Sequence, residues 1–283
     1  MTWPNFFIIG VSKAGTTSLY NYLSATKNVF LAPKGKIHYF YPKEFEKKDS
    51  KEKFQDIFKN TEGKKAIGEY SGYLDEPKSA ELIKSIVPNA KIIICLRDPV
   101  ERAFSHYLGT LRSKDETLSF TESFNKFMKP INKESEFFRR YIELGMYYEK
   151  IKKFLDVFGK DNVMIIIFEE FIIEPKKEFK EVINFLEIDS QIPDIVGKIY
   201  NAYAEPLGDL GMNIVKNKFV NKIARKIISK NVRVNLLRLL TNKRSKKPEL
   251  TKEQRMMLEE FYKKDAKDVE KLLGRKLPWE FIK

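Results

Sequence analysis

The chain alternates short apolar runs with longer amphipathic stretches. Apolar runs of strand length, bounded by turn residues, predict buried strands at residues 5–10, 66–70, 91–96 and 163–168. Apolar residues at helical spacing predict helices at residues 16–25, 79–87, 100–112, 139–158, 175–186 and 251–273. Strands that alternate with helices are typical of a mainly parallel sheet covered by helices. The pattern therefore predicts an α/β fold.

Two stretches depart from this alternation. Residues 113–135 are charged and weakly patterned, and we interpret them as a surface excursion. Residues 216–247 contain 12 basic residues and no acidic one, so this segment carries most of the net charge of +14. Its apolar positions fit a helix with a basic face. We expect a basic, mostly helical C-terminal extension at 212–247 within a single domain, 1–283, because no repeat or flexible linker divides the chain.

Composition excludes several classes of protein. With 283 residues, 42% of them hydrophobic, the chain can bury a core without a disulfide. It has one cysteine, Cys95, and two histidines, His38 and His106, so we predict no bound metal. The apolar run near the N-terminus is too short for a signal peptide or a membrane span. We therefore expect a soluble cytoplasmic protein, with peripheral membrane binding as one interpretation of its basic segment.

The sequence G-V-S-K-A-G-T-T-S lies between the first predicted strand and the first predicted helix. Such a junction presents free backbone N–H groups at a helix N-terminus and so favours anions. Lys13 adds a positive charge, and Thr16, Thr17 and Ser18 add hydroxyl groups. The spacing resembles a Walker A loop, but Thr16 stands where that motif has its lysine. The loop therefore suits a phosphate-like group better than the β- and γ-phosphates of ATP.

A second motif, L-R-D-P-V-E-R-A-F-S-H-Y, begins at the end of the third predicted strand. Arg97 stands where open parallel sheets bind their ligands, and its guanidinium matches the geometry of a phosphate. Ser105 follows eight residues later on the next predicted helix. The alternative for Arg97 is a surface ion pair with Asp98. We interpret His106 as structural.

Together the two motifs resemble those of sulfotransferases that use 3′-phosphoadenosine 5′-phosphosulfate (PAPS), especially the heparan-sulfate-type and bacterial members. The resemblance implies a P-loop-like three-layer fold with a central, mainly parallel sheet, and PAPS as a co-substrate without a metal. It implies that the 5′-phosphosulfate is held by Lys13, Ala14, Gly15, Thr16, Thr17 and Ser18. Arg97 and Ser105 would hold the 3′-phosphate, and a loop at 201–212 would cover the nucleotide, with Lys198 and Tyr203 as candidate contacts.

The acceptor side departs from the family in the segment P-K-G-K-I-H-Y-F. Relatives commonly have K-E-x-H-F-F, with the glutamate as general base, where this chain has Lys36. Three interpretations fit. In the first, His38 is the base, since an imidazole exchanges a proton near neutral pH. In the second, Lys36 binds an anionic acceptor or the sulfuryl group, and Glu69 or Glu44 is the base. In the third, the chain binds PAPS and transfers the sulfuryl group poorly. The segment G-E-Y-S-G-Y-L resembles one beside the family's acceptor cleft, so Glu69 and Tyr73 are candidates to line that cleft, with plain core packing as the favoured alternative for Tyr73.

The leading hypothesis is a PAPS-dependent sulfotransferase that moves a sulfuryl group in line to a hydroxyl or amine, with adenosine 3′,5′-bisphosphate as product. The acceptor implied by the resemblance is a carbohydrate, a lipid-linked glycan or a small molecule. One alternative is a P-loop NTPase or small-molecule kinase, supported by residues 10–17 and by Glu169 and Glu170 after the last predicted strand. A second is a non-catalytic module that binds glycans or an anionic membrane surface through 216–247. No nucleic-acid-binding module accompanies the charge, so nucleic acid is not expected as a partner; the oligomeric state stays open.

Overall fold

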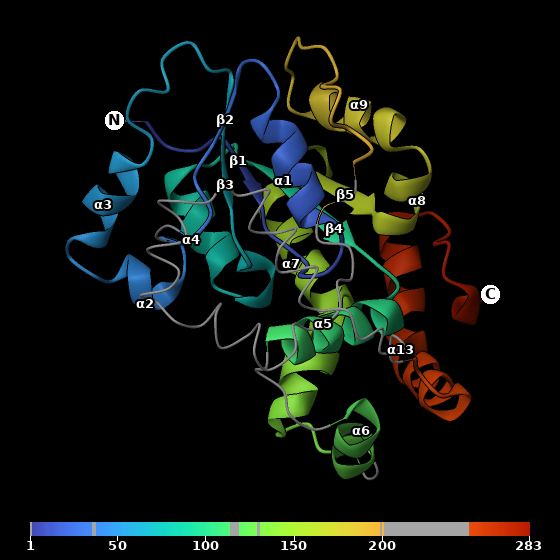
Figure 1. Ribbon diagram of the computed structural model, residues 1–283. Coiled ribbons are helices and arrows are strands. Elements are labelled where there is room, and N and C mark those ends of the chain that lie inside the picture. The colour runs from blue at the N-terminus through green and yellow to red at the C-terminus, as the bar shows by residue number, and fades with distance from the viewer. Residues whose placement is uncertain (1, 36–37, 114–118, 129–130, 199, 201–248) are drawn as a thin grey trace, which may run out of the picture.

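A five-stranded parallel sheet forms the centre of the molecule (Figure 1). The computed structural model describes residues 2–35, 38–113, 119–128, 131–198, 200 and 249–283. The strand order is β2-β3-β1-β4-β5, and each neighbouring pair is parallel. The strands are β1 (Phe6–Ile8), β2 (Val29–Leu31), β3 (Ala66–Tyr70), β4 (Lys91–Leu96) and β5 (Val163–Ile167).

These segments form strands because they are apolar on both faces. β1 is buried throughout, and β4 is buried at every position after its first. A parallel sheet covered on both sides removes such side chains from water, which is the main stabilising contribution to the core. The four predicted strands are therefore confirmed. β2 was not predicted, because three residues at a sheet edge are too few to show a period.

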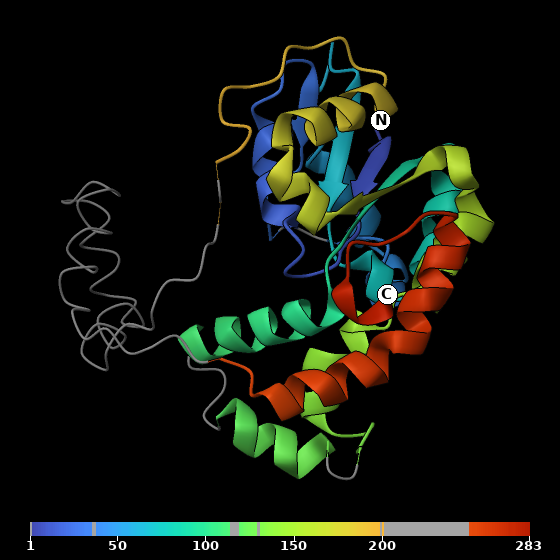
Figure 2. The same cartoon turned by 90° about the vertical axis from the view of Figure 1, so that its right-hand side faces the viewer.

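Helices cover both faces of the sheet (Figure 2). One layer contains α1 (Thr16–Ser24), α8 (Phe168–Ile173) and α9 (Pro175–Phe185). The opposite layer contains α4 (Ser79–Ile86) and α7 (Tyr148–Phe158). Two short helices beside the β2 edge were not predicted, α2 (Pro42–Phe45) and α3 (Ser50–Asp56) (Figure 1). The predicted fold class, a three-layer α/β arrangement, is confirmed.

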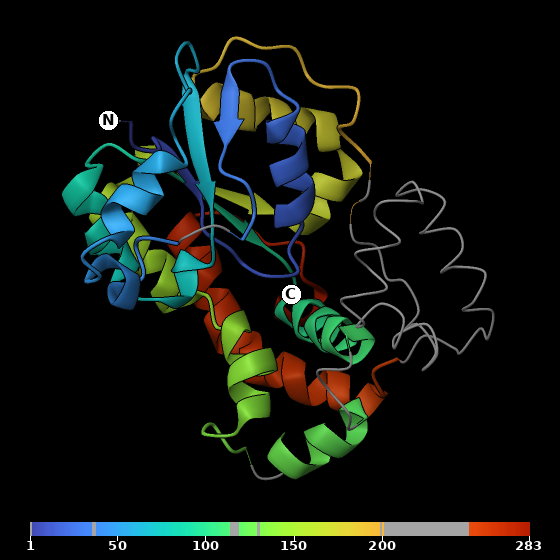
Figure 3. The same cartoon turned by 60° about the vertical axis from the view of Figure 1, so that its left-hand side comes forward.

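A further group of helices lies beneath the carboxyl ends of the strands (Figure 3). It contains α5 (Pro99–Ser113), α6 (Phe120–Met128) and α13 (Lys252–Leu273). These helices enclose a second hydrophobic cluster with an aromatic centre, which includes Phe104, Tyr107, Phe120, Phe124, Tyr141 and Tyr262. The prediction of a surface excursion at 113–135 is therefore wrong for α6. Its buried residues Phe120, Phe124 and Met128 recur every four positions, and the charged residues between them obscure the pattern.

The predicted continuous helix at 139–158 is also wrong. A π-helical turn (Phe138–Ile142) and a 3₁₀ turn (Glu143–Gly145) precede α7, which begins at Tyr148. At Gly145 an added Cβ would lie 3.0 Å from the Tyr262 ring of α13, so a larger residue would push this ring aside. The Asp265 carboxylate of α13 then accepts hydrogen bonds from the backbone N–H groups of Tyr147, at 2.7 Å, and Tyr148, at 3.2 Å. A distant side chain therefore caps α7.

The C-terminal helix α13 begins with a capping box. The Thr251 hydroxyl accepts a hydrogen bond from the Gln254 backbone N–H, and the Gln254 side chain accepts one from Thr251. Within the part of the chain that the structure describes, no helix is long and apolar enough to cross a membrane. The basic segment predicted at 212–247 lies outside the described residues.

Candidate functional site

The two sequence motifs meet in one cleft at the carboxyl edge of the sheet. The cleft has a volume of about 460 Å³, within the usual range for small-molecule sites. Its lining includes most of the residues assigned to the nucleotide from the sequence, namely Lys13, Gly15, Thr16, Thr17, Ser18, Arg97 and Ser105. Ala14 is buried and does not line the cleft. Residues about 80 positions apart are therefore brought together, as expected for loops that follow neighbouring parallel strands.

The loop between β1 and α1 has the backbone shape of an anion site. It continues the pairing with β4, since the Val11 N–H donates to the Cys95 carbonyl at 2.8 Å. Lys13 and Gly15 have φ angles of 73° and 82°, with a residue of ordinary φ between them. Alternation of this kind directs successive N–H groups to one side, which forms an anion-binding concavity. A Cβ at Gly15 would lie 2.9 Å from the Phe168 ring. Glycine is therefore favoured at this position both by the positive φ angle and by this close contact.

The Lys13 side chain extends across α5 at Gly109. A Cβ built at Gly109 would lie 2.5 Å from Lys13 Nζ and 3.2 Å from its Cε. Gly109 was not among the predicted site residues, although a glycine inside an amphipathic helix is itself a signal, because it weakens the helix. Its missing side chain makes room for the ammonium group of Lys13.

A second cation lies at the α1 side of the site. The ammonium of Lys34 is 4.2 Å from the centroid of the Tyr20 ring and 5.3 Å from that of Tyr70. Burial lowers the pKa of Lys34. The Tyr70 hydroxyl in turn lies 3.2 Å from the buried hydroxyl of Thr16. Lys34 and Tyr70 were not selected from the sequence, because only the fold places them beside the loop.

Arg97 is held in position by several contacts. Its Nη1 donates to the Lys13 carbonyl at 3.2 Å, its guanidinium stacks 4.7 Å from the Phe168 ring centroid, and Nη2 lies 3.7 Å from Glu101. The hydroxyl of the buried Tyr147 donates to the Arg97 carbonyl at 2.9 Å. The guanidinium is therefore preorganised at the cleft, and its ion-pair partner is Glu101 rather than Asp98.

Asp98 caps α5 instead. Its Oδ1 accepts hydrogen bonds from the backbone N–H groups of Val100, at 2.8 Å, and Glu101, at 3.2 Å. Burial raises the pKa of Asp98 to about 6, and these hydrogen bonds oppose the rise. The cap therefore carries a charge that the fold tolerates poorly.

The acidic residues after β5 have structural partners. Glu169 accepts from the Asp98 backbone N–H at 3.0 Å and from the Trp279 indole N–H at 3.3 Å. Glu170 pairs with Arg275 at 3.0 Å. Both oxygens of Glu169 are thus engaged, which removes the support that these carboxylates gave to an NTPase. No group of three or more His, Cys, Asp or Glu suited to a metal occurs among the described residues.

The rest of the cleft is mainly apolar. Its wall includes Tyr22, Phe104, Leu108, Phe168, Phe171, Ile172 and Tyr200. The Tyr22 hydroxyl donates to the Lys198 carbonyl at 2.7 Å and accepts from the Gly197 N–H at 3.1 Å. Lys198 therefore contributes its backbone here, and its side chain is not part of the lining. Tyr203 lies outside the described residues.

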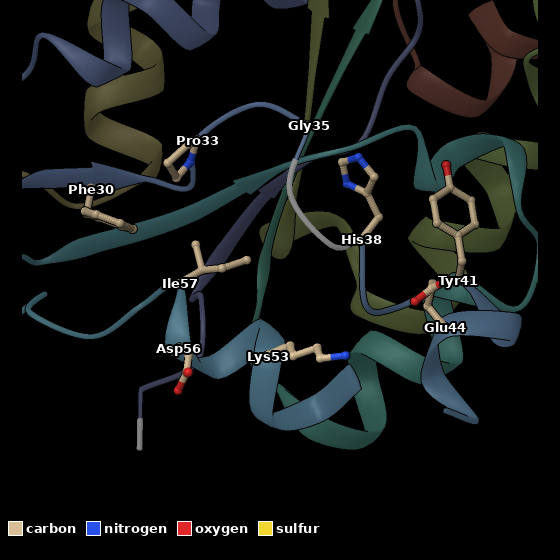
Figure 4. Close-up of a pocket in the computed structure, with 9 residues that line it drawn as sticks. All are labelled: Phe30, Pro33, Gly35, His38, Tyr41, Glu44, Lys53, Asp56 and Ile57. Carbon is tan, nitrogen blue, oxygen red and sulfur yellow. The ribbon is translucent and has the colours of Figure 1, made fainter. Parts of the chain in front are cut away.

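A second, more open cavity of about 900 Å³ lies on the β2 side of the sheet (Figure 4). Phe30, Pro33, Tyr41 and Ile57 give it an apolar and aromatic lining, and His38, Glu44, Lys53 and Asp56 add polar groups. Glu44 is paired with Lys47 and accepts from the Ser50 hydroxyl at 3.1 Å. Four residues were weighed as the base or as the group that holds the acceptor. His38 and Glu44 border this cavity, Glu69 does not, and Lys36 lies outside the described residues.

Glu69 and Tyr73 lie behind His38 rather than along either cavity. His38 Nδ1 is 3.4 Å from Glu69 Oε1, and the Tyr73 hydroxyl donates to the same oxygen at 2.8 Å. The side chain of His38 is 37% exposed and that of Glu69 only 3%. Burial raises the pKa of Glu69, against the hydrogen bonds from His38 and Tyr73. Neither Glu69 nor Tyr73 lines a cavity: the β3 backbone turns Glu69 into the core, and Tyr73 is buried in the 3₁₀ turn that follows (Tyr73–Asp75), as its core-packing alternative expects.

His106 has the structural placement that we expected. It packs against Tyr141, with ring centroids 5.4 Å apart. Burial, together with the positive charges of Arg102, Lys13 and Arg140, lowers the pKa of His106 to about 3. It is therefore a neutral imidazole at physiological pH.

The family follows from a comparison with known domains. The sulfotransferase domain model matches residues 4–270, nearly the whole chain, and the chain belongs to this family. Its fold agrees with that of a sulfotransferase from Alicyclobacillus acidocaldarius, which is 28% identical with a TM-score of 0.72, over 98% of both chains. The resemblance inferred from the two motifs is confirmed.

Curated relatives carry more specific names. The chain is 36% identical over 115 residues to the membrane-associated sulfotransferase kil1 of Dictyostelium discoideum, a match that covers 37% of this chain and 22% of that protein. It is 26% identical over 193 residues to mouse heparan sulfate glucosamine 3-O-sulfotransferase 3A1, which covers 68% of this chain and 47% of that protein. The chain therefore spans less than half the length of these relatives.

Proposed function

We propose that this chain transfers a sulfuryl group from PAPS to a hydroxyl or amine of a carbohydrate. The observation that carries the proposal is the single cleft that contains both anion-binding motifs, the loop with Lys13 at one place and Arg97 with Ser105 at another. A donor with two separate anionic ends matches such a cleft. The aromatic and aliphatic wall between them suits a purine base.

The donor-binding roles follow from the placement of the side chains. The N–H groups of the β1–α1 loop, with the hydroxyls of Thr17 and Ser18, would hold the 5′-phosphosulfate. Arg97 and Ser105 would hold the 3′-phosphate, since a preorganised guanidinium can donate two parallel hydrogen bonds. Bound PAPS supplies a sulfuryl group activated by its link to phosphate. The ammonium of Lys13 stabilises the negative charge that develops on the leaving phosphate.

The acceptor side rests on the second cavity and on His38. The acceptor oxygen or nitrogen bonds to sulfur as the sulfur–oxygen bond to phosphate breaks, and the acceptor gives up a proton. His38 takes this proton, because a protonated lysine at position 36 cannot. The aromatic lining beside His38 suits the apolar face of a sugar, and the mouse relative is named for action on a glucosamine unit.

Calorimetry of nucleotide binding tests the donor site. We expect adenosine 3′,5′-bisphosphate to bind without metal, and Arg97→Ala to weaken this binding by about 10- to 100-fold, as for a lost charge-assisted pair. The matched control is Arg275→Ala, which removes an arginine that pairs with Glu170 outside the cleft. Tighter binding of ATP with Mg²⁺, or no bisphosphate binding, would contradict the proposed donor site and favour the NTPase alternative.

Transfer itself is measured with ³⁵S-labelled PAPS and a panel of heparosan, N-sulfated heparan and chitin oligosaccharides. We expect label in at least one glycan, and loss of the label with Lys13→Ala. Bisphosphate binding without transfer to any glycan would exclude a carbohydrate acceptor of these kinds and favour a small-molecule acceptor.

We further propose that the protein is cytoplasmic and binds anionic membranes through residues 216–247. The 12 basic residues of that segment support this, as does the name of the Dictyostelium relative. Co-sedimentation with phosphatidylserine vesicles at low and high salt tests it. Equal binding to neutral vesicles would contradict an electrostatic attachment.

A further inference from the structure

A buried carboxylate lies directly behind the exposed imidazole of His38. Oε1 of Glu69 is 3.4 Å from His38 Nδ1, and it also accepts the Tyr73 hydroxyl at 2.8 Å. We infer that Glu69 is a positioning residue that holds the proton of His38 on Nδ1 and leaves Nε2 bare to act as the base. The inference rests on the proposed function.

Exposure separates the roles of the two residues. A base must touch the acceptor, and the Glu69 side chain is 3% exposed while that of His38 is 37% exposed beside the open cavity. Glu69 therefore cannot meet a sugar without passing the imidazole. It can act on the acceptor only through His38, as a buried carboxylate acts through a histidine in other enzymes.

The hydrogen bonds fix the tautomer. With Glu69 ionised, as this role requires, its oxygens only accept hydrogen bonds, and Oε1 already accepts the Tyr73 hydroxyl. Nδ1 of His38 must then be the donor, and Nε2 is left as the acceptor. The opposite tautomer would direct an N–H at the acceptor hydroxyl and could not remove its proton.

In the part of the chain that the structure describes, the second oxygen of Glu69 makes no hydrogen bond that competes with His38. Oε2 is buried and has no hydrogen-bond partner within the described residues. The other titratable rings near His38 are Tyr41 and Tyr73, with centroids 6.3 Å and 6.5 Å away. Glu69 is therefore the nearest counter-charge for the imidazolium that forms when His38 takes a proton. A carboxylate behind a histidine thus takes over from the glutamate that relatives have at the position of Lys36.

Nuclear magnetic resonance of the histidine side chains tests the tautomer without any acceptor. The chain has only two histidines, so ¹⁵N-labelled imidazoles give two spin systems, and His106→Gln assigns them. In the full-length protein we expect His38 to carry its proton on Nδ1, and in Glu69→Ala we expect the Nε2–H form to appear. Tyr73→Phe is the matched control, since it removes the other donor to Oε1 and leaves the pair intact. An Nε2–H tautomer in the wild type, or an unchanged tautomer in Glu69→Ala, would overturn the inference.

A double-mutant cycle tests the link to turnover, with labelled PAPS and the glycan that the panel selects. We expect His38→Ala to lower kcat by about 100-fold or more, the usual contribution of a general base. Glu69→Gln should lower kcat by about 10- to 100-fold alone and have no further effect in the His38→Ala background. A full additional loss in that background would make Glu69 an independent base and refute its positioning role.

The two proposals fail in different ways. A wild-type protein that does not bind adenosine 3′,5′-bisphosphate refutes the sulfotransferase function, whatever the tautomer of His38. Normal bisphosphate binding with an Nε2–H tautomer refutes only the role of Glu69. If Glu69→Ala does not fold, the wild-type spectrum still decides, because the inference requires Nδ1–H there.

Discussion

The close approach of Lys13 to α5 predicts that Gly109→Ala separates stability from activity. The new Cβ would lie 2.5 Å from Lys13 Nζ, whereas carbon and nitrogen atoms in contact are about 3.5 Å apart, so the ammonium must move by about 1 Å. A long side chain can make this movement at little cost in stability. Alanine also favours a helix interior over glycine by about 0.5–1 kcal/mol, so we expect the melting temperature to rise by about 2–4 °C.

Activity should change in the opposite direction. If Lys13 stabilises the leaving phosphate as proposed, a displacement of its charge by about 1 Å can lower kcat/KM by about 10- to 100-fold. The assay is transfer of labelled sulfuryl groups, beside thermal unfolding of the same samples. Lys13→Ala is the background control, in which Gly109→Ala should cost no further activity. Wild-type kcat/KM in Gly109→Ala, or a lower melting temperature, would refute the account.

Three further predictions address the supports of the site. In Asp98→Asn the amide still caps α5, and we expect the free energy of unfolding in urea to rise by at most about 3 kcal/mol at pH 8 and not at pH 4. The folded pKa of about 6 exceeds the ordinary value of 3.8, so the wild-type aspartate favours folding below about pH 4 and loses this contribution as pH rises through 6. An equal effect at both pH values would contradict the assignment. Tyr147→Phe leaves the Arg97 carbonyl without its 2.9 Å partner, which should cost about 1–3 kcal/mol and weaken bisphosphate binding in calorimetry; unchanged affinity would show that Arg97 needs no such support. Phe124→Ala, at a fully buried position of α6, should cost about 3–5 kcal/mol in urea unfolding, whereas a surface excursion would lose almost nothing.

The sequence predicted those parts of the fold that leave a local signal. β4 and β5 were recognisable because burial on both faces makes them continuously apolar. The break before α7 was not, because apolar residues keep their helical spacing on both sides of it, and the close contact of Gly145 with Tyr262 there joins residues more than 100 positions apart. α6 was missed for the related reason that its buried positions are few and lie among charged residues.

The candidate site divides in the same way. The meeting of Lys13 with Arg97 could be expected, because loops that follow parallel strands share one edge of the sheet. The partnership of His38 with Glu69 could not, since it depends on which way β3 turns its side chains into the core. Gly109 could not be identified, because its role is to leave space for the Lys13 side chain. Which residue fills that space depends on the fold and leaves no pattern in the sequence.

The position of α13 has a consequence for biosynthesis. Asp265 caps α7, and the indole of Trp279 binds Glu169, which in turn holds the backbone of Asp98 beside Arg97. A ribosome completes both loops proposed to bind the donor long before it reaches these residues. The nascent chain therefore has these loops without the contacts by which Asp265 and Trp279 support Tyr147 and the backbone next to Arg97. We expect the domain to reach its full affinity for the nucleotide only after residue 279 has left the exit tunnel. The domain therefore completes its folding late in translation.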